Sequence, residues 1–138
     1  MNIPEFDAFL AGFPVFLTHS AVSLFILFIG TLIYMKLTRH DEMALIREGN
    51  IAASLSLGAA IVGLALPLAF SLAASASLYD LIIWGVVALL LQIVAFRVMD
   101  LFLKDLPERI EKGEMGSAIL LVSVKLGTAM INAAAIAG

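Results

Sequence analysis

Four long apolar segments dominate this sequence, and each is close to the length that a helix needs to cross a lipid bilayer. A hydrocarbon core of about 30 Å takes about 20 helical residues. The alternating pattern of a transmembrane strand is absent from these segments, and lipid requires a backbone that satisfies its own hydrogen bonds. The sequence therefore predicts an all-α membrane protein with four transmembrane helices, at about Phe13–Met35, Ile51–Ala74, Leu81–Phe96 and Met115–Ala137. The third helix extends to Phe102 if the Arg97 side chain reaches the interface.

The composition excludes several other classes of protein. Hydrophobic residues make up 62% of the 138 residues and charged residues 14%, whereas soluble domains have about 45–50% and about 25%. The net charge of −3 leaves no positive excess for the phosphates of a nucleic acid. The absence of cysteine excludes disulfides and thiolate chemistry. We therefore expect a single membrane domain over residues 1–138 whose partner is the lipid bilayer and not nucleic acid.

The basic residues predict an orientation. Met1 to Ala8 contains no Lys or Arg, whereas a cleavable signal peptide needs a basic region there, so the first apolar segment is expected to remain as a helix. The turn near Ser75 to Asp80 has no basic residue either. The positive-inside rule then predicts that both basic loops are cytoplasmic and both termini lie outside. Seven of the eight basic residues lie in or beside these loops: Lys36, Arg39, Arg47, Arg97, Lys104, Arg109 and Lys112. The loops are short and mixed in charge, so their residues are expected to be solvated helix caps.

The two halves of the chain resemble each other. When the sequence is shifted by 64 residues without a gap, 14 of the 57 pairs from Leu17 to Ala73 are identical. They include the less apolar pairs Asp41/Asp105, Gly49/Gly113 and Gly63/Gly127. This indicates a duplicated helical hairpin, with repeat one at about residues 13–74 and repeat two at about 78–138. Because each unit has two spans, the repeats are expected to be parallel and not inverted.

Lys125 is the charged residue inside an apolar segment. At 1.5 Å per residue it lies about 15 Å from the cytoplasmic end of its helix, where a lysine costs at least about 2.5–3.5 kcal/mol. It should therefore face protein or water. Gln92 of the preceding helix lies at a similar depth and could accept a hydrogen bond from the ammonium. No Asp or Glu lies in the middle of a span, so an anion, a lipid head group or water is a candidate counterpart.

Two interpretations of this region remain open. In the first, a ligand or pathway site is formed by Lys125, Gln92, Thr128 and Asn132. In the second, the same residues make structural polar contacts between helices and bind nothing. His19 is expected to be a polar contact, because no second His or Cys could complete a metal site with it. Neither a metal nor a cofactor is predicted.

Small residues on the second and fourth spans predict close helix packing. Small side chains let membrane helices approach, which is a main source of packing energy in lipid. Gly63 and Gly127 occupy matching positions in the two repeats, and replacing either should disturb packing or assembly. Pro67 is expected to kink its helix, because it leaves the carbonyl of Gly63 without its usual partner.

The loop motif resembles a known family. The first copy reads Glu48-Gly49-Asn50-Ile51-Ala52-Ala53, and the second reads Lys112-Gly113-Glu114-Met115-Gly116-Ser117. Two hairpins with a Gly at the entrance of each second helix resemble the domain-of-unknown-function 350 family over nearly the whole chain. The second copy departs from the family pattern, with Glu114 in place of Asn. The resemblance implies a bacterial inner-membrane protein. It implies no particular activity, because the family has no settled one.

Three hypotheses about function follow. The leading one is a non-enzymatic membrane protein that works as a homo-oligomer or as a membrane subunit beside a protein partner. The alternative is a small oligomeric channel or carrier with an anion-selective polar site around Lys125. A membrane enzyme is disfavoured, because no close pair of titratable residues supplies a nucleophile and a base.

Overall fold

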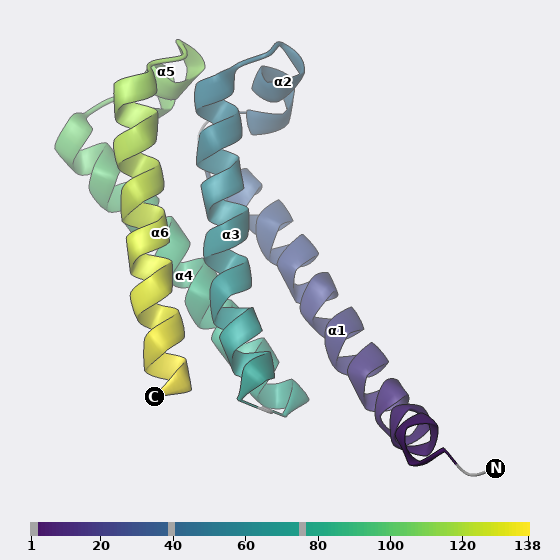
Figure 1. The fold of residues 1–138 in the computed structure, drawn as a ribbon. Helices are drawn as coiled ribbons and strands as arrows, with labels where there is room; N and C mark the ends of the chain where they lie inside the picture. The colour runs from purple at the N-terminus through teal and green to yellow at the C-terminus, as the bar shows by residue number, and fades with distance from the viewer. Residues whose placement is uncertain (1–2, 39–40, 75–76) are drawn as a thin grey trace.

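A computed structural model describes residues 3–38, 41–74 and 77–138 (Figure 1). Four of its helices are long and apolar enough to cross a membrane. The prediction of an all-α membrane protein with four transmembrane helices is therefore confirmed. The elements are α1 (Pro4–Leu37), α2 (Glu42–Arg47), α3 (Ile51–Ala73), α4 (Leu78–Leu103), α5 (Leu106–Glu111) and α6 (Met115–Ala137).

Two of the long helices extend beyond the apolar segments that predict them. Helix α1 begins at Pro4 instead of Phe13, because a proline suits the first turn of a helix and acidic residues there favour the positive end of its dipole. Helix α4 continues through Arg97 to Leu103. The Arg97 guanidinium donates through Nη2 to the carbonyl oxygen of Leu37, at 3.0 Å. This bond joins α4 to the last residue of α1.

The long helices form a bundle with a central pair (Figure 1). Helices α3 and α6 lie side by side and run in the same direction, and they share the most extensive contact of the fold. Helix α4 crosses behind both, whereas α1 leans away from the bundle toward its N-terminus. The short helices α2 and α5 lie at one end and both termini lie at the other.

The two short helices end in the same way. Gly49 after α2 has a φ of +85°, and Gly113 after α5 has a φ of +76°. Glycine is favoured here because the left-handed conformation that closes a helix is costly for residues with a Cβ. Helices α2 and α5 begin 64 residues apart, and so do α3 and α6. These bounds agree with the predicted shift, and the duplication itself stays a prediction.

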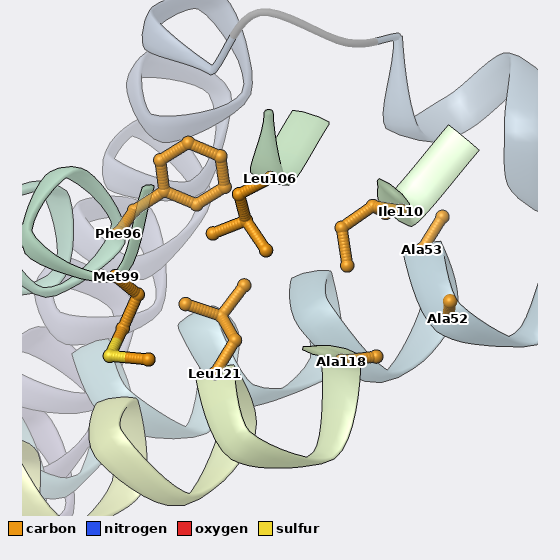
Figure 2. Close-up of a cluster of buried hydrophobic side chains, with 8 residues drawn as sticks. All are labelled: Ala52, Ala53, Phe96, Met99, Leu106, Ile110, Ala118 and Leu121. Carbon is orange, nitrogen blue, oxygen red and sulfur yellow. The ribbon is translucent and has the colours of Figure 1, made fainter. Parts of the chain in front are cut away.

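The main apolar core lies at the end of the bundle that carries the short helices. Figure 2 shows Leu106 and Ile110 of α5 directed toward Phe96, Leu121 and the alanines of α3. Helix α5 thus closes the bundle between α3, α4 and α6. The cluster consists of Ala52, Ala53, Phe96, Met99, Leu106, Ile110, Ala118 and Leu121. A second cluster of Tyr34, Leu57 and Ala60 joins α1 to α3.

The contact between α1 and α4 depends on a glycine. A Cβ atom at Gly85 of α4 would lie only 2.6 Å from Cγ2 of Ile26 on α1. Since the glycine has no side chain, Ile26 can pack directly against the backbone of α4. Beyond this contact, toward its N-terminus, α1 exposes large apolar side chains such as Phe9, Phe13 and Phe16, which suits a helix that borders lipid.

Candidate functional site

The Lys125 ammonium is fully buried inside the bundle. Its side chain is 0% exposed, and Nζ donates to two oxygens of Ser56 on α3, the backbone carbonyl at 2.8 Å and Oγ at 3.0 Å. Lys125 is the eleventh residue of α6 and Ser56 the sixth of α3, so Lys125 lies about 7.5 Å further along its helix than Ser56 does along α3. Helical side chains lean toward the N-terminus of their helix, and the long lysine side chain covers that difference.

Two aromatic rings complete the surroundings of the ammonium. Nζ lies 4.6 Å from the ring centroid of Tyr34 on α1 and 5.7 Å from that of Phe96 on α4. The two rings meet edge to face, with centroids 6.5 Å apart. A cation over an aromatic face gains about 0.5–2 kcal/mol, more where water is excluded. Residues from the other three long helices therefore surround the positive charge that α6 carries.

Gln92 contacts Lys125 in a different way from the predicted one. Its amide nitrogen Nε2 donates to the backbone carbonyl of Lys125 at 3.1 Å, instead of its oxygen accepting from the ammonium. That prediction was wrong because the ammonium leans away from Gln92 toward Ser56. Among the described residues, the buried Gln92 Oε1 has no hydrogen-bond donor.

Gly63 makes room for Gln92. A Cβ atom at Gly63 would overlap the Gln92 amide and lie 2.5 Å from its Cδ. Gly63 therefore accommodates a polar side chain, whereas its role in close packing between helices stays a prediction. At Gly127, the position that matches Gly63 in the predicted repeat, a Cβ atom would meet no atom of the described chain within 4 Å. Gly127 is therefore not a packing contact within one protomer.

Glu42 supplies the negative charge that the sequence interpretation missed. The residue is only 1% exposed, and its Oε1 accepts from Thr38 Oγ1 at 2.9 Å. It lies close enough to Lys125 for the two charges to interact. The prediction that the loop residues are solvated caps is wrong at this position, because α2 folds back against α3. A sequence signal existed, since Glu42, Leu45 and Ile46 share one helical face.

The titration of Glu42 reflects its surroundings. Burial raises the pKa of Glu42 to about 7, while the Thr38 hydrogen bond and the Lys125 charge act in the opposite direction. Glu114, before α6, behaves differently because it is exposed. Hydrogen bonds from Ser117 and Arg109 lower the pKa of Glu114. Of these two carboxyl groups, only Glu42 is poised to exchange a proton near neutral pH.

Thr128 and Asn132 are not brought to the Lys125 ammonium. Both are half-buried on α6, and neither hydrogen-bonds to Nζ, whose two partners are both on Ser56. The lysine side chain leans toward the start of α6, whereas Thr128 and Asn132 lie beyond Lys125 toward the end of that helix, so the ammonium points away from them. Within the described part of the chain, Asn132 Nδ2 is buried without an acceptor. Pro67 is buried in the interior of α3.

The two loop segments that match in the sequence, before α3 and before α6, make different contacts. Asn50 caps α3 by accepting from the Ala53 amide, and its Nδ2 donates to the carbonyls of Ile110 and Glu111 at the end of α5. Glu114 occupies the matching place before α6, but a carboxylate cannot donate to carbonyls. It instead forms an ion pair with Arg109 at 2.9 Å. Asn50 thus joins the two halves of the chain, and Glu114 does not.

The fold defines a multi-pass helical membrane protein with a charged side chain enclosed at its centre. The chain matches the family model described as Domain of Unknown Function (DUF350) over residues 8–136, and it belongs to that family. It is 30% identical over 128 residues to the UPF0719 inner membrane protein YjfL of Escherichia coli strain K12, covering 93% of this chain and 94% of that one. The same figures hold for YjfL of Escherichia coli O157:H7. No solved structure matches. Together the relatives and the four apolar helices identify a multi-pass inner-membrane protein.

Proposed function

We propose that this protein is a non-enzymatic membrane component that works as a homo-oligomer or as the membrane subunit of a larger complex. One observation carries the proposal. The Lys125 ammonium is enclosed within one protomer by Ser56 and two aromatic rings, while a face of small residues on α6 is at least partly exposed. This face comprises Gly116, Ser123, Gly127 and Ala134. A second copy of the chain is the partner that we favour for it.

The charge arrangement favours this role over the anion-selective channel or carrier. Lys125 already has an internal counter-charge in Glu42, so an anion is not needed to neutralise it. An anion flux through proteoliposomes that disappears in Lys125→Met would instead support the channel. The stoichiometry of the purified protein is the measurement that tests the oligomer directly.

Gly127→Leu should weaken self-association. The leucine would project from the open face of α6, where close approach of a second helix requires small residues. We expect the mass of the detergent-solubilised complex, measured by light scattering, to shift from an oligomer toward the protomer. Gly58→Leu is the matched control, because a Cβ at Gly58 also meets no atom within 4 Å. Equal masses for the parent and Gly127→Leu would remove this face from the proposal.

We further propose a topology with both termini outside and a duplicated hairpin as the architecture. The basic side chains Lys36, Arg47, Arg97 and Lys104 belong to the end of the bundle that carries α2 and α5. The positive-inside rule assigns that end to the cytoplasm. The matching 64-residue offsets of α2/α5 and α3/α6 support two parallel units. Arg39 and Ser75, which belong to the same sequence argument, lie outside the described residues.

Single cysteines can test the topology, because the chain has no cysteine of its own. In spheroplasts, a membrane-impermeant maleimide should label Tyr79→Cys and Gly138→Cys, which lie at the end with the termini. Glu48→Cys and Glu111→Cys should react only after lysis. All four positions are exposed, so a failure to react reports the side of the membrane and not burial. Labelling of Glu48→Cys in intact spheroplasts would reverse the topology.

A further inference from the structure

We propose that Glu42 and Lys125 together form a proton-binding site that opens to the end of the bundle carrying α2 and α5. This inference is independent of the proposed oligomeric role. The bound ligand is a single proton, which solvent water delivers to the carboxylate of Glu42. The carboxylate becomes a neutral carboxylic acid, and the proton returns to water when the site empties.

The first support is the enclosure of two opposite charges. Glu42 is 1% exposed and Lys125 is 0% exposed. In surroundings of low polarity, a carboxylate and an ammonium stabilise each other, and each also carries a cost of desolvation. Thr38 provides one hydrogen bond to Glu42, and Ser56 provides two acceptors for Lys125. The protonation of Glu42 is therefore tied to the charge of Lys125.

The second support is a route for water. A cleft of about 410 Å³ at the end of α1 is lined by Glu42, Lys36, Thr38 and Asp41, together with the apolar side chains of Leu32, Met35 and Met43. A cleft with several polar groups is the kind that holds water. On the other side of the pair, toward the end with the termini, Leu64 and Ala129 are buried and apolar. Exchange is therefore expected from one side of the membrane.

The third support is the set of groups that act on Glu42 from the elements around it. Helix α3 has no ionisable side chain. Arg97 of α4 is engaged with the Leu37 carbonyl. Arg39 and His40 precede α2 and lie outside the described residues. Of the remaining groups, Asp41 before α2 and Lys125 of α6 act on Glu42 by their charge, Tyr34 of α1 feels the charge of Glu42, and Lys36 of α1 lines the same cleft. Burial raises the pKa of Glu42 to about 7, and Lys125 holds it below the value that burial alone would give.

Infrared difference spectra of the protein in proteoliposomes would test the site. As the pH is raised from 5 to 9, the parent should lose the carbonyl band of a protonated carboxylic acid, with the midpoint of the loss near pH 7. Glu42→Gln should remove that band. Glu48→Gln should keep it, because Glu48 is an exposed carboxylate at the end of the same helix. A band that persists in Glu42→Gln would overturn the proposal.

Lys125 variants test the coupling even if Glu42→Gln fails to fold. Lys125→Met removes the positive charge, so the midpoint should move to higher pH, whereas Lys125→Arg should keep it close to the parent value. A merely structural role for Lys125 predicts the same midpoint in all three proteins, and that result would also overturn the proposal.

The side of exchange can be measured in the same vesicles. After a jump in the external pH, the fraction of the carboxyl signal that responds at once should equal the fraction of Glu48→Cys that external maleimide labels. A fraction that instead matches the labelling of Gly138→Cys would place the opening at the wrong end.

Discussion

Gly63→Leu should lower the free energy of unfolding of the protomer by about 3 kcal/mol or more. The new side chain would overlap the Gln92 amide, which is buried and bonded to the Lys125 carbonyl. Overpacking costs about 1–3 kcal/mol, and losing a buried hydrogen bond adds about 1–3 kcal/mol. Denaturation in mixed micelles, followed by circular dichroism, would measure the loss.

Gly127, 64 residues further along the chain, provides the control for this substitution. Gly127→Leu makes the same change at the matching place in α6, where a Cβ meets no atom within 4 Å. Its unfolding free energy should stay within about 1 kcal/mol of the parent, in line with ordinary surface substitutions. If both variants lost equal stability, the Gln92 contact would not be the reason. The pair also separates folding from assembly, because only Gly127→Leu is expected to change the mass of an otherwise stable protein.

Glu42→Gln and Lys125→Met should be strongly coupled in the free energy of unfolding. Each substitution leaves the other group enclosed without its counter-charge, and a buried charge without a partner is costly. Because burial raises the pKa of Glu42, the ionised carboxylate is itself costly, so the coupling is the expected signal and not the loss in either single variant. The double variant, in which neither charge remains, should be more stable than the sum of the two single effects predicts. A double-mutant cycle would measure the coupling, and values of about 1–3 kcal/mol are typical of contacting residues.

One result of the double-mutant cycle would contradict the proposed interaction between Glu42 and Lys125. If the losses of the two single variants simply add in the double variant, Glu42 and Lys125 do not interact. Glu48→Gln combined with Lys125→Met serves as the control cycle, since Glu48 is exposed at the far end of α2. That combination should be additive, because an exposed carboxylate is screened by solvent.

The spans, the short helices and the depth of Lys125 could all be predicted from the sequence. The length of the apolar segments alone predicts four membrane helices, because the thickness of the bilayer sets the number of apolar residues that any spanning helix needs. Gly49 and Gly113 end the short helices through a local backbone preference that needs no tertiary contact. The enclosure of Lys125 follows from the cost of a charge in lipid, which applies whichever neighbours surround it.

The partners of Lys125 were decided by the tertiary structure. The sequence identifies Gln92, Thr128 and Asn132 by depth and face, but the direction of the lysine side chain joins it to Ser56 instead. Glu42 enters the site because α2 folds back against α3, a contact between elements that helical periodicity does not specify. Gly63 and Gly127 are equivalent in the sequence, yet only Gly63 faces Gln92. Spacing along one helix determines which residues share a face, whereas the packing of several helices determines what that face meets.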